Sequence, residues 1–217
     1  PLSTAVAGIH AHLRAAGAPD APALLASLAA LGLPANGTAP TRFWARDILD
    51  PTAAGFAPGT AQARFLLVNS QVAHLYGAGA GLVALYRNAT AAAAVARLGQ
   101  ALGAFAEGTV VALATREHLR SVLLLAVDDA GNGTRAAGGG RRLAQAAGAV
   151  ATVEAAADVV SSINRVTAEV LANVTAVRAP SAAAELLGEL SKLAVVSDGA
   201  ARDLKAAAEG KAALAAV

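Results

Sequence analysis

Apolar spacing near the N-terminus predicts two short helices. In residues 2–16 apolar side chains recur at helical spacing until Gly17 and Pro19 end the pattern. A second helix is predicted over 22–31, with Asp20 placed before it as a cap. The next stretch, 35–62, is rich in Pro, Gly and Thr and predicts a loop or edge strand.

The middle of the chain has the pattern of two strands around a glycine run. Two compact apolar runs, 64–70 and 81–86, are bounded by polar residues and predict strands. Gly77, Gly79 and Gly81 predict a bend or bulge between them. A phosphate-binding loop needs a helix after its glycines and an acidic residue about twenty positions on, so nucleotide binding is not expected.

Beyond this unit, the pattern predicts a helix and then two more strands. The segment 89–106 has a single apolar face at helical spacing. The runs 109–114 and 122–127 predict strands, because the first is rich in β-branched residues after a glycine. One continuous helix over 109–127 is the alternative, since Ala and Leu also favour helices.

The C-terminal third, 151–217, predicts an antiparallel helical hairpin interrupted near Pro180. Its two apolar faces are formed by Val153, Val160, Ile163, Val170, Val174 and Val177 on the first helix and by Leu186, Leu190, Leu193, Leu204 and Leu214 on the second.

Together these elements predict an α+β fold. We expect a small mixed sheet with packed helices over about 42–150, followed by the hairpin. The predicted division is 1–34 for the short helices, 35–150 for the α+β module and 151–217 for the hairpin.

Composition limits the classes of function. Hydrophobic residues make up 56% of the 217 residues, but aromatic residues only 3%, so the core should be built from Leu and Val. The net charge is only +2 and the basic residues are scattered, which argues against nucleic-acid binding. There is no Cys and no Met, and the chain begins at Pro1, so we expect a processed protein or a segment of a longer one.

The uncharged run 65–86 is long enough to span a bilayer, but its polar residues and central glycines argue against this.

Asparagine placement carries the strongest clue to the compartment. Four of the six asparagines begin an Asn-x-Thr sequence, far more than chance gives. This pattern predicts a secreted or cell-surface glycoprotein with exposed glycosylation sites. The four acceptors are Asn36, Asn88, Asn132 and Asn173.

Other chemistry-bearing residues form no recognisable site. His10 and His12 would point to different faces of a helix and have no third ligand nearby in sequence, so no metal site is expected. The turn with Asp128 and Asp129 lacks the terminal Glu of a calcium loop. No nucleophile and base motif is present, so we predict no enzyme activity and no cofactor.

The middle of the chain contains a set of short motifs in a fixed order. They are Leu67-Val68-Asn69, Val72-Ala73, Gly79, Gly81, the run 82–90, the helix ending at Phe105, and Gly108-Thr109-Val110-Val111. This order resembles the interleukin-like EMT inducer (ILEI, or GG) domain family, over 42–150 at most. That resemblance implies a compact α+β module that binds sugars or protein partners and does no chemistry.

The sequence therefore predicts a non-catalytic extracellular or cell-surface glycoprotein segment. It would act in binding, adhesion or structural assembly, with other protein chains as partners of the hairpin and carbohydrate as a further ligand. The alternative is a bacterial envelope or sensory helical-bundle protein whose sequons carry no glycan.

Overall fold

The computed structural model describes residues 2–35, 60–107, 109–128, 139–173 and 180–215. Every regular element in these ranges is a helix, and no strand occurs in them. The prediction of an α+β fold with a mixed sheet is therefore wrong. The helices are α1 (Leu2–Ala15), α2 (Asp20–Ala30), α4 (Ala61–Arg87), α5 (Ala91–Phe105), α6 (Arg116–Val127), α7 (Gly139–Asn173) and α8 (Pro180–Ala215).

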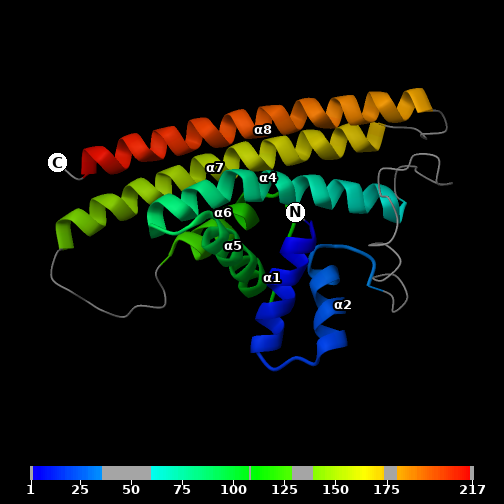
Figure 1. Cartoon of the computed structure of the whole chain (residues 1–217), viewed down its shortest axis with the longest axis horizontal. Coiled ribbons are helices and arrows are strands. Elements are labelled where there is room, and N and C mark those ends of the chain that lie inside the picture. Colours follow the sequence, from blue (N-terminus) through cyan, green and yellow to red (C-terminus); the bar gives the residue numbers. More distant parts are fainter. Residues whose placement is uncertain (1, 36–59, 108, 129–138, 174–179, 216–217) are drawn as a thin grey trace.

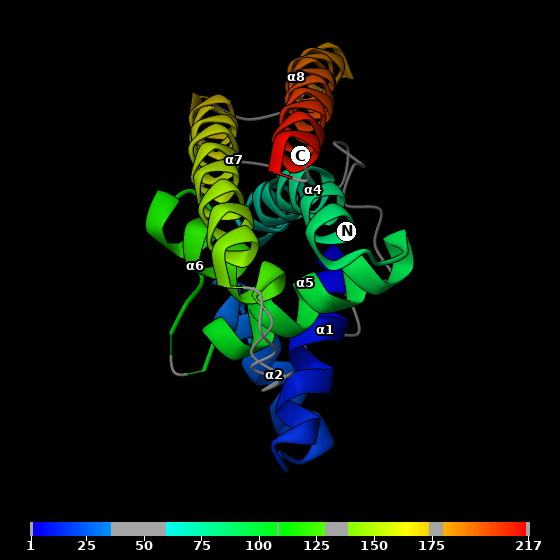
Figure 2. The same cartoon turned by 90° about the vertical axis from the view of Figure 1, so that its left-hand side faces the viewer.

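Three long helices pack against one another as a bundle, which we call the long layer, and the shorter helices pack below it. Figure 1 shows α4, α7 and α8 running along the length of the molecule, with α5 and α6 beneath them. The pair α1 and α2 projects from this lower side, and the view in Figure 2 shows the same grouping end-on. Most buried apolar residues belong to one core shared by both layers, which includes Val72, Leu98 and Val160.

Helix α4 replaces the two central strands that we predicted at 64–70 and 81–86. Its start is capped by Thr60, whose Oγ1 accepts a hydrogen bond from the backbone N–H of Ala63 at 3.3 Å. Its end is set by Asn88, which adopts the left-handed conformation with φ of 48°. The 27-residue helix between these caps reads as strands in sequence because short runs of Leu, Val and Phe suit a buried helix equally well.

The glycine run is neither a turn nor a bulge, because it lies inside α4. Gly77 is exposed, whereas Gly79 is buried against α5 and α6. A Cβ at Gly79 would lie 3.1 Å from Leu98 and 2.9 Å from Leu123. The missing side chain therefore lets two neighbouring helices approach α4, which compensates for the poor helix propensity of glycine.

The predicted strands at 109–114 and 122–127 are also absent. Residues 116–127 form helix α6, and 109–115 is irregular, so the alternative of one continuous helix is wrong as well. Val111 and Leu113 are nevertheless buried, and the backbone N–H of Val111 donates to the carbonyl of Ala30 at 2.7 Å. Their apolar side chains pack in the core, although the backbone there is an irregular connection and not a strand.

The helical predictions near the N-terminus, at 89–106 and in the C-terminal third are confirmed. Helices α1, α2 and α5 occupy the predicted segments to within a few residues. Helices α7 and α8 pack together as an antiparallel hairpin, with Leu171 and Leu186 in one buried cluster at one end. The first hairpin helix begins at Gly139, earlier than predicted, and both hairpin helices also pack on α4.

Helix α1 crosses α5 with the two backbones in direct contact. A Cβ added at Gly8 would lie 2.4 Å from Cα of Gly99, and one at Gly103 would lie 2.5 Å from Cβ of His12. No side chain fits between the helices at Gly8 and Gly99, so glycine is required there for packing. This crossing fixes the projecting pair of helices to the rest of the molecule.

Candidate functional site

Asn88 occupies an exposed turn between α4 and α5. After this left-handed residue, the Oγ1 of Thr90 accepts a hydrogen bond from the N–H of Ala93 at 3.3 Å and so caps α5. Asn tolerates the left-handed region better than most residues, and Thr is a preferred helix cap. Both residues of this sequon thus have a role in the turn, and the Asn88 side chain remains at the surface.

Asn173 is the last residue of α7 and is also exposed. The end of α4 and the end of α7 lie at opposite ends of the long layer (Figure 1). Asn36 and Asn132 lie outside the described residues. The two sequon asparagines that the structure places are therefore at the surface and far apart.

The two asparagines outside sequons have structural roles. Asn69 accepts a hydrogen bond from the backbone N–H of Leu2 at 3.2 Å, which ties α1 to α4. Asn164 is fully buried in α7. The asparagines thus divide into two kinds, since those outside sequons bond within the fold and the described ones inside sequons face the solvent.

Asn164 is the centre of a buried polar cluster where α4, α7 and the segment before α6 meet. Its Nδ2 donates to the carbonyl of Leu113 at 2.6 Å and lies 3.4 Å from the carbonyl of Gln71. Its Oδ1 lies 2.8 Å from Nδ1 of His74, and its own carbonyl accepts from the Gln71 side chain at 3.2 Å. We call Gln71, His74 and Asn164 the polar junction.

The hydrogen bonds of the polar junction define the tautomer of His74. Because Nδ2 of Asn164 is committed as a donor to Leu113, the atom facing the imidazole is the acceptor Oδ1. Nδ1 of His74 therefore carries the hydrogen. Burial lowers the pKa of His74 below its usual value of 6.5, and the hydrogen bond to Asn164 opposes that shift only in part. His74 is thus a neutral buried imidazole near pH 7.

Two tyrosines of α4 have contrasting environments. Tyr86 hydrogen-bonds through its hydroxyl to Oγ1 of Thr152 on α7 at 3.0 Å. The hydroxyl of Tyr76 is buried close to Gly99, and among the described residues it has no hydrogen-bond partner. Burial raises the pKa of Tyr76 to about 12.

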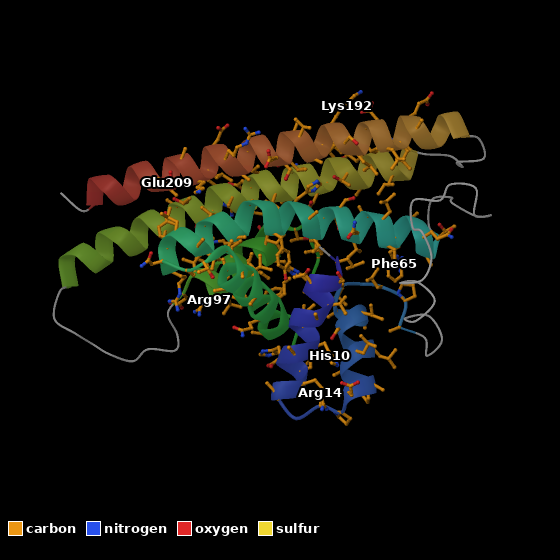
Figure 3. All side chains as sticks on the ribbon, viewed as in Figure 1. His10, Arg14, Phe65, Arg97, Lys192 and Glu209 are labelled. Atoms are coloured by element: carbon orange, nitrogen blue, oxygen red, sulfur yellow. The ribbon has the colours of Figure 1, made fainter. Side chains whose placement is uncertain are left out.

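His10 and His12 lie on the projecting part of the molecule and contact different carboxylates. Nε2 of His10 is 3.2 Å from Asp20, and Nε2 of His12 is 2.7 Å from Glu107. Figure 3 shows His10 and Arg14 on this α1 and α2 pair. Within the described residues, no three His, Asp, Glu or Cys side chains gather in a way that could hold a metal ion.

A shallow cleft of about 330 Å³ lies beside His12, between α1, α5 and α6. Four alanines line it, together with polar side chains that include Arg97 and Gln100. The Arg97 guanidinium donates to the carbonyls of Ala126 at 2.7 Å and of Asp128 at 2.6 Å. Arg97 thereby caps the C-terminal end of α6, and Asp128 contributes only its backbone carbonyl to this cap. Asp129 lies outside the described residues.

Among the described side chains of the long layer, those of α8 include the most exposed apolar ones. Val195 and Val196 expose 69% and 58% of their surface, and Leu187 is also exposed. Charged residues on this helix pair along it, as in Lys192 with Glu189 at 2.6 Å. Figure 3 shows Lys192 projecting from the side of α8 that faces away from α4 and α7.

Sequence reasoning missed the polar junction and the caps of α4. Gln71 and His74 lie three positions apart, which was the one local sign of a shared helical face. Asn164 follows 90 residues after His74, and no sequence pattern connects them. Thr60 and Asn88 were available as cap signals, but Asn88 was interpreted only as a glycosylation site.

The fold and these sites define an all-helical chain, within the described residues, built on a long antiparallel hairpin. Comparisons with known protein families, with curated proteins and with solved structures found no match. The segments 67–73 and 82–87, which the resemblance to the ILEI family requires as strands, are helical in α4. Among the described helices, none has the combination of length and apolar character needed to cross a membrane.

Proposed function

We propose that this chain is a non-catalytic segment of an extracellular or cell-surface glycoprotein that serves in structural assembly. The observation that carries the proposal is the division of the asparagines. Asn69 and Asn164 bond inside the fold, whereas Asn88 and Asn173 combine a sequon with an exposed side chain. A protein that uses these Asn-x-Thr sequences as glycan acceptors must present them in this way.

The assembly role is supported by the surface of α8. Glycans on Asn88 and Asn173 would lie near the two ends of the long layer. Val195 and Val196, in the middle of α8, would remain uncovered between them. Exposed apolar side chains on a long helix suit contact with another protein chain.

The glycan prediction is tested by intact-mass measurement on the full chain from its native source, before and after enzymatic removal of N-glycans. We expect a mass loss, with conversion of Asn to Asp at Asn88 and Asn173. Asn69 and Asn164 serve as internal controls and should be unchanged. An unmodified mass would contradict the proposal.

Matched variants at the α4–α5 turn sharpen this test. Asn88→Gly removes the acceptor but keeps a residue suited to the left-handed conformation, so the variant should lose one glycan and remain folded. Thr90→Ser preserves both the sequon and the hydroxyl that caps α5. A mass difference between Asn88→Gly and the parent chain that equals the Asn-to-Gly exchange alone would show that Asn88 carries no glycan.

The assembly role is tested separately by a photo-crosslinking residue at Val196 in the full native chain. A single discrete adduct from position 196, and none from the exposed Ala7 of α1, is the expected result. No adduct, or the same adduct from both positions, would count against assembly through α8.

A bacterial envelope or sensory helical-bundle protein is the second candidate, and the helical fold favours it. Such proteins are built from long antiparallel helices like α7 and α8. The mass measurement separates the two candidates, because this second function requires no glycan.

A further inference from the structure

His74 lies where the hairpin meets the rest of the molecule. It exposes only 4% of its surface, and its single described hydrogen bond joins α4 to Asn164 of α7. Asn164 in turn donates a hydrogen bond to the carbonyl of Leu113, just before α6. Three chain segments are therefore linked through one imidazole and one amide.

The groups bonded around His74 are all neutral. The described partners in the junction are the side chains of Gln71 and Asn164 and the carbonyl of Leu113. A protonated imidazole would keep its Nδ1 hydrogen bond, but among the described residues no carboxylate bonds to it to offset its charge. Burying an uncompensated charge is unfavourable.

The described charged groups of α7 and α8 are exposed except Glu154, which is half-buried and paired with Arg120 of α6 at 3.1 Å. On α7, Asp158 and Arg165 are exposed, and Asp158 pairs with Arg116 of α6. On α8, Lys192 and Asp198 are exposed and pair along their own helix. On α4 itself, Tyr76 is directed to Gly99 of α5. Only burial and the Asn164 hydrogen bond act on the pKa of His74 within the described chain, and none of these ionic groups does.

We propose that His74 is an acid-sensitive lock, whose protonation at Nε2 loosens the packing of the α7–α8 hairpin on α4. Nε2 takes a proton from the solvent, while Nδ1 keeps the hydrogen that it donates to Asn164. The open form, with a solvated imidazole, accepts this proton near the usual pH of 6.5, and the closed form resists it. The lock therefore holds above that pH and weakens as the pH falls below it.

The absence of Cys from the chain allows a direct test by thiol labelling. Ala157→Cys places a reporter on α7 at a fully buried position, and Ala5→Cys places one in the core of α1, away from the hairpin. Each full-length variant is labelled with 4,4′-dithiodipyridine at pH 7.5 and 5.5. Each rate is divided by the rate of the same variant in denaturant at the same pH, which removes the effect of thiol ionisation.

The relative rate at Ala157→Cys should rise roughly tenfold between pH 7.5 and 5.5, which is the effect of one proton taken up by an open form that titrates near 6.5. The rate at Ala5→Cys should rise much less. Adding His74→Asn, whose amide can replace the Nδ1 donor but does not titrate, should abolish the rise. An unchanged rate at Ala157→Cys, an equal rise at Ala5→Cys, or a rise that survives His74→Asn would each overturn the proposal.

A second measurement observes His74 itself, so it does not depend on whether the His74→Asn variant folds. In the native protein labelled with ¹⁵N-histidine, the signals of His74 should show the neutral Nδ1–H form at pH 6. A charged imidazole at pH 6, while the Ala157→Cys reporter stays protected, would overturn the lock.

Discussion

The contact of α1 with α5 and the contact of α7 with α4 hold helices together by opposite means. At the first, Gly8 and Gly99 bring two backbones together with no room for a side chain. At the second, the polar junction fills the space with hydrogen-bonded side chains from both helices. The first contact depends on volume, and the second depends on donors, acceptors and charge. The comparison shows that one chain can join helices either by close backbone packing or by a buried hydrogen-bonded cluster, and only the second places an imidazole inside the core.

The largest expected effect comes from filling the glycine crossing. Gly99→Leu should lower the free energy of unfolding by about 3 kcal/mol or more, because its Cβ would meet the backbone of Gly8, which cannot move aside as a side chain can. Urea unfolding monitored by circular dichroism measures the loss.

The matched control is Gly77→Ala, at an exposed position of α4 with nothing within 4 Å. This change should stabilise the chain by about 0.5–1 kcal/mol through helix propensity alone. Equal effects of the two substitutions would refute the distinct role of the crossing.

A smaller loss is expected from emptying the polar junction. Asn164→Ala should cost about 2–3 kcal/mol, because it leaves the carbonyl of Leu113 and Nδ1 of His74 buried without their partner. Ser162→Ala, at an exposed position of α7, should change stability by less than about 0.5 kcal/mol. Urea unfolding at pH 7.5 compares them, and similar values for the two variants would show that the junction contributes little.

The smallest effects separate the two tyrosines. Tyr86→Phe should cost about 1 kcal/mol, because it removes the hydrogen bond to Thr152. Tyr76→Phe should be neutral or slightly stabilising, since it removes a buried hydroxyl without a partner in the described residues. Thermal unfolding of the two variants measures the difference, and a greater loss for Tyr76→Phe would reveal a partner that its hydroxyl needs.

Sequence reasoning succeeded where the signal was local and periodic. Leu98 and Leu102 defined a face of α5, and Val153 and Val160 defined one of α7, and all four are buried. Sequence reasoning failed in α4, where the glycines at 77, 79 and 81 were taken as a break between strands. The physical reason is that side chains of α5 and α6 pack against Gly79 and leave no room for a Cβ there. These neighbours are distant in sequence, so the local sequence does not indicate them.

The sequence by itself determined the periodic helices at both ends of the chain, the absence of disulfides and the four candidate glycan acceptors. These depend on residue type and short-range spacing. Only the tertiary structure decided that α4 is one helix and that His74 meets Asn164. A run of Leu, Val and Ala has similar local preferences for helix and strand, so packing makes the choice. A buried hydrogen bond across 90 residues exists only once the long helices have come together.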